Sequence, residues 1–330
     1  MDNNKRAGTY WAKLLRDDKI NLELFSYNNS LSLSKKKEIF KKYVGIVNLE
    51  TSTYCNRKCV YCPQYNSQRG ERQSYIDEHV YRQILSSLKE INFNQYISLN
   101  LYNEPLADND IFNRISKAKK FLPDAYVLFN SNGDFLTREI IDRLLRVGNN
   151  AIYVTLQTNG QYEDTERLRA VKAFISRLGL KYSINHHIPN RSILVDLNYN
   201  NMNIKVMTSN WSKYGNYRAG AVKSLQNKTL RQNPCMRPIR EITIAQSGKV
   251  YLCCNIFPGD KESFRSLAGS VKDDNIFNIY LNNYMVDLRH KLFDFGSKPF
   301  PCSFCSDEDN ADIASSSRRS EILKKAKSLI

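Results

Sequence analysis

Hydrophobic and polar positions in the middle of the chain form a repeating order of short apolar runs and longer amphipathic segments. The apolar runs predict strands, and the segments with helical periodicity predict helices. Expected strands cover residues 45–51, 96–101, 125–130 and 151–157, and expected helices cover residues 77–91, 110–121, 137–147 and 162–178. This repeat indicates an α/β fold with a parallel sheet, in which functional side chains gather at the carboxyl ends of the strands.

The repeat changes after residue 178. Two further strands are expected at 192–197 and 204–209, but too few residues separate them to hold a crossover helix. This favours a partial (β/α) TIM-like barrel of five or six parallel strands. Tyr10, Trp11, Leu14 and Leu15 have helical spacing before the barrel. The expected organisation is a helical extension over 1–43, the barrel over 44–222, a small cysteine-rich domain over 223–310 and a C-terminal helix or tail over 311–330.

Composition limits the classes of protein that the chain can be. Its 330 residues are 42% hydrophobic, and no apolar run has the length of a membrane span or a signal peptide, so we expect a cytoplasmic protein. The eight cysteines are then expected to be reduced thiols or metal ligands. The net charge of +16 fits an anionic partner, such as an electron donor of the flavodoxin or ferredoxin type, but also a solvated basic surface. No RNA-binding signature is present, so nucleic acid is not an expected partner.

Three cysteines directly follow the first predicted strand. Cys55, Cys59 and Cys62 form a CxxxCxxC run. A [4Fe-4S] cluster takes one protein ligand per iron, so three thiolates leave one iron open to an exogenous ligand. A zinc site is the alternative, although zinc sites favour paired CxxC spacing.

This run, with Tyr61 before its last cysteine, resembles that of the radical S-adenosylmethionine (SAM) superfamily. The resemblance implies that SAM binds the open iron and is reductively cleaved to a 5′-deoxyadenosyl radical, which abstracts a hydrogen atom from the substrate. Tyr61 is included among the residues implied to line the cofactor site.

Further segments at predicted strand ends are similar to motifs of the same superfamily. Tyr102-Asn103-Glu104-Pro105 stands where the family has Gly-Gly-Glu-Pro, which implies that Glu104 binds the SAM amino group. The departure at both glycines leaves backbone recognition at Asn103 open. The segment Asn130-Ser131-Asn132-Gly133 is similar to the family's Thr-Asn-Gly segment near the SAM ribose. Gln157, at the fourth strand end, is implied to reach the SAM carboxylate or ribose.

A second cysteine set lies in the C-terminal third of the chain. Between Cys235 and Cys253, the residues after position 241 predict a hairpin with Gly248 in its turn. This spacing, followed by Cys302 and Cys305, resembles the SPASM and twitch auxiliary-cluster domains. No cysteine follows Cys305, which favours the twitch form with one auxiliary [4Fe-4S] cluster. A zinc ribbon is the alternative.

The layout is similar to that of 2-deoxy-scyllo-inosamine dehydrogenases and of aminoglycoside epimerases. It implies an oxidoreductase for a polar hydroxylated small molecule, such as a sugar, an aminocyclitol or a nucleotide-like compound. Our preferred hypothesis is oxidation of an alcohol to a ketone, with Arg218 orienting the hydroxyl group because it precedes Cys235 by about the family's interval. Cys254, the one cysteine without an implied cluster role, would donate a hydrogen atom in an epimerase.

Two further alternatives come from other classes of protein. A ribosomal peptide maturase usually carries a leader-binding domain, and the 43 residues before the barrel are too few for one. A non-catalytic iron-sulfur or zinc scaffold would have no use for the carboxylate of Glu104.

Overall fold

A computed structural model describes residues 20, 22–27, 31–71, 73–157, 163–226, 229–307 and 316–327. The predicted apolar stripe from Tyr10 to Leu15 lies outside these residues.

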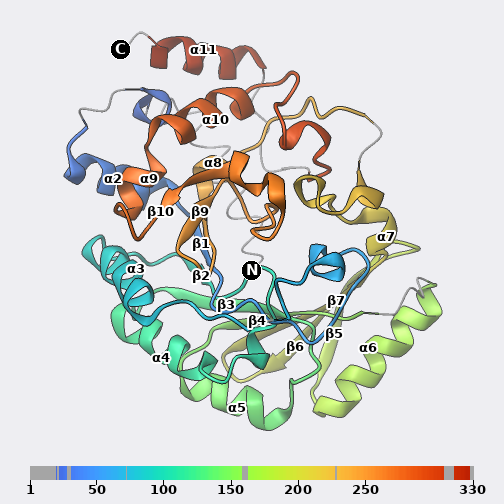
Figure 1. Ribbon diagram of the computed structural model, residues 1–330. Helices are drawn as coiled ribbons and strands as arrows, with labels where there is room; N and C mark the ends of the chain where they lie inside the picture. The colour runs from blue at the N-terminus through green and yellow to red at the C-terminus, as the bar shows by residue number, and fades with distance from the viewer. Residues whose placement is uncertain are drawn as a thin grey trace.

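Strands within the described ranges form a single ten-stranded sheet in the order β10-β9-β8-β1-β2-β3-β4-β7-β6-β5 (Figure 1). The run β8-β1-β2-β3-β4-β7 is parallel throughout. The strands are β1 (Ile46–Leu49), β2 (Tyr96–Ser98), β3 (Tyr126–Ser131), β4 (Ala151–Thr155), β5 (Tyr182–Ile188), β6 (Ser192–Tyr199), β7 (Met202–Ser209), β8 (Glu241–Ile244), β9 (Lys249–Tyr251) and β10 (Leu267–Ser270).

The first four predicted strands are confirmed as β1 to β4. The two later ones are β6 and β7, which form an antiparallel hairpin, and β7 then pairs with β4 in parallel. No crossover helix joins β6 to β7, as their short separation predicts. β5 was not predicted. Every residue of β5 is exposed, so the strand has no buried face that would produce an alternating pattern.

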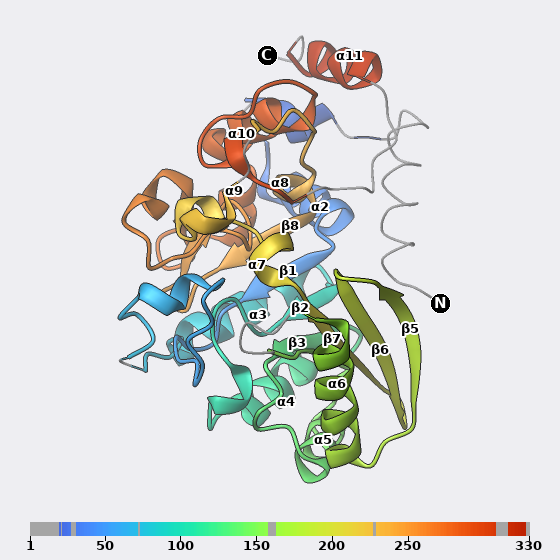
Figure 2. The same cartoon turned by 90° about the vertical axis from the view of Figure 1, so that its right-hand side faces the viewer.

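The four predicted crossover helices cover one side of the curved sheet (Figures 1 and 2). They are α3 (Glu78–Glu90), α4 (Ile111–Phe121), α5 (Arg138–Arg146) and α6 (Asp164–Leu178). α3 begins where the Asp77 side chain accepts bonds from the amides of His79 and Val80, and α5 begins at an equivalent Thr137 cap. The other helices are α2 (Leu33–Tyr43), α7 (Trp211–Tyr214), α8 (Arg237–Arg240), α9 (Ile276–Tyr280), α10 (Asn283–Phe293) and α11 (Ser316–Lys327).

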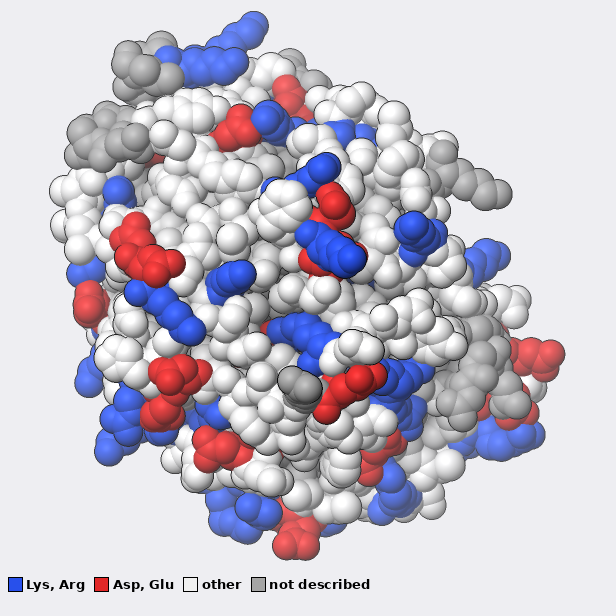
Figure 3. Space-filling view, viewed as in Figure 1, with Lys and Arg blue, Asp and Glu red and all other residues white. Residues whose placement is uncertain are grey.

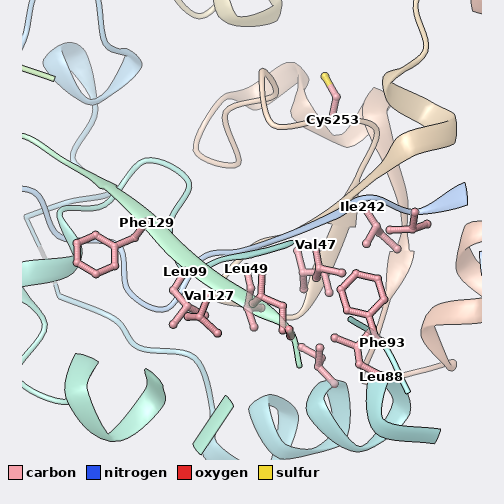
Figure 4. Packing of buried hydrophobic residues seen from close by; sticks show 14 of the residues in the cluster. Val47, Leu49, Leu88, Phe93, Leu99, Val127, Phe129, Ile242 and Cys253 are labelled. Atoms are coloured by element: carbon pink, nitrogen blue, oxygen red, sulfur yellow. The ribbon is translucent and has the colours of Figure 1, made fainter. Parts of the chain in front are cut away.

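The core lies between the parallel strands and these helices. Val47 and Leu49 of β1 and Leu99, directly after β2, are fully buried, and Leu88 of α3 packs in the same cluster (Figure 4). Cys253 lies apart from them in that view, on the loop that follows β9. Burial of large apolar side chains at about 1.5–3 kcal/mol each fixes the strands, and therefore also the loops at their carboxyl ends.

The cysteine-rich part of the chain extends the same sheet. The predicted hairpin is confirmed as β8 and β9, with Gly248 at φ +87°, in a turn where a side chain is disfavoured. β8 pairs in parallel with β1, so the expected barrel and auxiliary domain share backbone hydrogen bonds. The boundary at residues 222 and 223 stays a prediction.

Basic and acidic side chains are interspersed over the face seen in Figure 3. None of the helices in the described part of the chain is long and apolar enough to cross a membrane.

Candidate active site

The CxxxCxxC loop lies a few residues after β1 and is held by hydrogen bonds to its own backbone carbonyls. The amide of Cys62 donates to the carbonyl of Cys59 at 2.8 Å, and Lys58 Nζ donates to the carbonyls of Gln64 and Ser67 at 3.2 and 3.0 Å. The fold therefore presents the three thiols on one short loop at the carboxyl end of β1.

Burial raises the pKa of all three thiols, that of Cys55 to about 11. They are therefore neutral at neutral pH without a metal, and ligation would release their protons. Among the described residues, no three His, Cys, Asp or Glu side chains are placed so that they could hold a single metal ion. Ligands of a four-iron cluster each bind a different iron, so such convergence is not needed for one. The soft thiol donors fit an iron-sulfur cluster.

Polar side chains tie this loop to the loop after β3. Arg57 forms a bidentate ion pair with Asp134, and Asn56 Nδ2 donates to the same carboxylate at 2.7 Å. Asn132 Nδ2 donates to Asn56 Oδ1 at 2.7 Å and lies 3.9 Å from Cys55 Sγ. Sequence reasoning did not identify Asn56, Arg57 or Asp134. Their positions next to the CxxxCxxC run and the Asn130–Gly133 segment were the only signal that could have pointed to them.

Glu104 is the centre of the predicted cofactor residues. Its side chain is buried, and Oε1 accepts bonds from Ser131 Oγ at 2.8 Å and from the Leu106 amide at 3.1 Å. Oε2 accepts from the Asn132 amide at 2.7 Å. An ionised carboxylate has about four acceptor sites, so these three bonds leave one on Oε2 for a further donor. Burial raises the pKa of Glu104, while the three hydrogen bonds oppose the shift.

The other predicted cofactor residues are used differently. Asn103 is buried and accepts from the Leu101 amide while donating to Ser52 Oγ, so its amide holds neighbouring loops together. Asn130 donates to Asn100 Oδ1 at 3.2 Å. Gln157 is half-buried, two residues after the end of β4. Tyr61 is half-buried, with its ring 6.1 Å from that of Trp211.

The second cysteine set is brought together from three segments. Cys235 precedes α8, Cys253 follows β9, and Cys302 and Cys305 flank one helical turn in which the Cys305 amide donates to the Cys302 carbonyl. Burial raises the pKa of Cys302, and the nearby Cys235 and Cys305 raise it further. Cys253 and Cys302 interact in the same way. The four thiols are thus close enough to repel one another's charge.

Arg218 lies close enough to Cys62 and to Cys254 to interact with both electrostatically. Its Nη1 donates to Asn255 Oδ1 at 2.5 Å, and its guanidinium lies 5.7 Å from the centre of the Tyr102 ring. Burial lowers the pKa of Arg218, but Tyr102, Cys254 and Cys62 raise it, and the net direction is upward. The side chain therefore stays cationic. It has φ +51°, which is unfavourable for a residue other than glycine and is common at functional sites.

Cys254 is half-buried, and its sulfur has a cationic partner. Arg237 Nη1 donates to Cys254 Sγ at 3.2 Å. Arg237 also pairs with Glu241 at 2.7 Å and with Asp307, whose Oδ2 accepts from Asn255 Nδ2 at 2.8 Å. Burial raises the pKa of Cys254 to about 12 although Arg237 opposes that shift. Sequence reasoning missed this polar network because its members come from three segments that are far apart along the chain.

Residues 49–192 match the family model of the Radical SAM superfamily. A curated relative from Niallia circulans, S-adenosyl-L-methionine-dependent 2-deoxy-scyllo-inosamine dehydrogenase, is 28% identical over 122 residues. That match covers 37% of this chain and 48% of the relative, so it spans about half the relative's length.

Two solved structures of BtrN have a similar fold. BtrN in complex with AdoMet and 2-DOIA is 19% identical, covers 80% of this chain and 93% of its own, and has a TM-score of 0.58. BtrN in an open conformation is 18% identical, covers 83% and 94%, and has a TM-score of 0.52. At this identity the similarity establishes the α/β fold. The match to the family model makes residues 49–192 similar to a radical SAM domain, and that family implies a [4Fe-4S] cluster and SAM as cofactors.

Proposed function

We propose that this protein is a radical SAM oxidoreductase that oxidises an alcohol carbon of a polar hydroxylated small molecule, of the aminocyclitol or sugar class, to a ketone. The observation that carries the proposal is the buried Glu104 carboxylate, which has one open acceptor site and lies beside the CxxxCxxC loop. The name of the Niallia circulans relative supports alcohol oxidation as the outcome.

Each part of the site has a role in this proposal. Cys55, Cys59 and Cys62 would hold the SAM-binding cluster, and Glu104 would accept a hydrogen bond from the SAM ammonium group. When bound, SAM and its cluster would supply a 5′-deoxyadenosyl radical that takes one hydrogen atom, and an auxiliary cluster would accept one electron, while the hydroxyl proton would be released to solvent. Arg218 would donate hydrogen bonds to the substrate hydroxyl and orient its C–H bond. An electron donor of the flavodoxin or ferredoxin type and a cytoplasmic location belong to the same proposal.

The auxiliary cluster would be bound by Cys235, Cys253, Cys302 and Cys305. Its support is the mutual electrostatic influence of these thiols and the buried Arg231, whose positive charge lowers the pKa of Cys235 against the larger effect of burial. A cation beside four thiolates would offset part of the negative charge that ligation creates.

Anaerobic reconstitution should give about eight irons per chain, four for each cluster. The triple variant Cys55→Ala, Cys59→Ala, Cys62→Ala should keep about four, because the C-terminal ligands are untouched. Cys254→Ala is the matched control and should keep about eight. Metal analysis that finds zinc in the C-terminal set, or no iron in the triple variant, contradicts the two-cluster proposal.

Epimerisation is the second candidate, because Cys254 lies near Arg218 and influences its pKa. An epimerase would return a hydrogen atom from the Cys254 thiol to the substrate carbon. In the structure, however, that sulfur is engaged by Arg237 within an ion-pair network, which favours a fixed packing role.

Reaction in deuterated water with 2-deoxy-scyllo-inosamine as the probe separates these two outcomes. We expect a ketone, and we expect Cys254→Ala to keep forming it, because oxidation needs no hydrogen donor. The thiol proton exchanges with solvent, so epimerisation would place one deuterium at an inverted carbon and would require Cys254. Mass spectrometry and NMR of the product make the distinction, and a deuterated inverted product would replace the dehydrogenase proposal with the epimerase.

A further inference from the structure

Tyr102 occupies the first position of the motif that carries Glu104, and its contacts reach both cysteine-bearing parts of the chain. Its hydroxyl donates to the carbonyl of Cys254 at 3.2 Å, while its own carbonyl accepts from Gln64 Nε2 at 3.2 Å, just after the CxxxCxxC loop. Its amide lies 3.4 Å from Glu50 Oε1 at the end of β1. Glycine at this position could form only the backbone contacts.

The Tyr102 ring is packed between two side chains from the C-terminal half of the chain. The Phe257 ring meets it edge-to-face, with centroids 5.0 Å apart and planes at 80°. The Arg218 guanidinium lies 5.7 Å from the same ring, within the range of a cation–π contact. One aromatic side chain therefore contacts the segment after β9 and also the residue proposed to orient the substrate.

A second contact fixes the same segment independently. Arg69, which forms a bidentate ion pair with the fully buried Glu50 at 2.9 and 2.5 Å, lies 5.8 Å from the Phe257 ring centre. A Cβ atom on Gly259 would lie 2.8 Å from Arg69 Cδ and 2.7 Å from the Phe257 ring. The chain thus passes so closely that only glycine fits there without a shift of its neighbours.

We propose that Tyr102 is a positioning residue that fixes Arg218 and the segment from Cys253 to Phe257 relative to the CxxxCxxC loop. The role of Arg218 toward a substrate rests on the function proposed above, whereas the fixation of the segment does not. Because the Tyr102 ring contacts both parts of the site, the substrate oriented by Arg218 would keep a fixed position relative to the CxxxCxxC loop, where the radical would form.

Hydrogen–deuterium exchange of the purified protein tests the fixation directly. Amides after β9 report on it, since Cys254 donates to Glu241 Oε1 and Ile256 donates to the Cys253 carbonyl. Tyr102→Phe keeps the ring and loses the bond to Cys254, so peptides over residues 251–264 should exchange about fivefold faster. Tyr102→Leu also loses the aromatic contacts and should exchange about tenfold faster or more.

Two controls distinguish positioning from general weakening. Tyr182→Phe, on the exposed strand β5, should leave residues 251–264 unchanged, and peptides of α4 should not respond in any variant. Unchanged exchange over 251–264 in both Tyr102 variants would overturn the proposal. So would equal acceleration across the whole sheet, which is the result of lost global stability.

Turnover of the reconstituted enzyme adds a second measurement. With 2-deoxy-scyllo-inosamine as the probe, Tyr102→Leu should raise KM and lower the coupling, which is the amount of ketone formed per 5′-deoxyadenosine. Tyr102→Phe keeps the ring and should therefore retain most of this coupling. Unaltered coupling in Tyr102→Leu contradicts the link to Arg218. If the parent enzyme forms no ketone, the proposed function fails, while the exchange measurement still decides the role of Tyr102.

Discussion

Glu104→Gln is expected to weaken SAM binding by about 10- to 100-fold, the equivalent of one lost charge-assisted hydrogen bond of ~1.5–3 kcal/mol. The substitution keeps the size of the side chain and removes its negative charge. It also replaces one acceptor oxygen by an NH2 group, which cannot accept a hydrogen bond from the donors that now bind Glu104, namely Ser131 Oγ and the amides of Leu106 and Asn132. Binding is measured by titrating SAM and following the paramagnetic spectrum of the reduced SAM-binding cluster.

The iron content of Glu104→Gln should equal that of the parent, because no thiol is changed. Glu139→Gln is the matched control, since Glu139 is exposed on α5. A Glu104→Gln protein that binds SAM like the parent would remove Glu104 from the cofactor site. Burial raises the pKa of Glu104, so as the pH falls its carboxylate takes up a proton at a higher pH than an exposed glutamate does. SAM binding by the parent should therefore begin to weaken at that higher pH.

Strong periodicity made the N-terminal half of the sheet predictable. β1 to β4 and their helices have buried faces, so the spacing of their apolar residues reports their structure directly. The motif residues Glu104, Ser131 and Asn132 then meet because parallel strands end at the same edge of the sheet. Local sequence and the rule for parallel strands were sufficient there.

Other features depend on contacts that a single sequence does not encode locally. β8 pairs with β1 although almost 200 residues separate them along the chain. Arg237 of α8, Asn255 after β9 and Asp307 after the Cys302–Phe304 turn come from three separate segments, and only the folded chain brings them into contact. Tyr102 departs from a family glycine, and the sequence reveals that departure without revealing its partner, the Cys254 carbonyl.

Arg218→Asn is expected to lower kcat/KM for alcohol oxidation by about 100-fold while changing the thermal midpoint of unfolding by only a few degrees. Asparagine tolerates the left-handed backbone that Arg218 adopts at φ +51°, so the substitution relieves strain that offsets the lost bond to Asn255. It cannot supply the cationic donors that we assign to substrate orientation.

The pattern of kinetic changes identifies the role of Arg218. If the guanidinium orients the substrate hydroxyl, Arg218→Asn should still cleave SAM but should release 5′-deoxyadenosine with little ketone. Arg218→Lys should recover part of the activity through its charge, though not the planar two-donor geometry. Arg169→Gln, an exposed position on α6, is the matched control and should behave like the parent. Parent-like ketone formation by Arg218→Asn would show that the Arg218 side chain does not orient the substrate. The positive φ at residue 218 would then have only a structural role in the backbone.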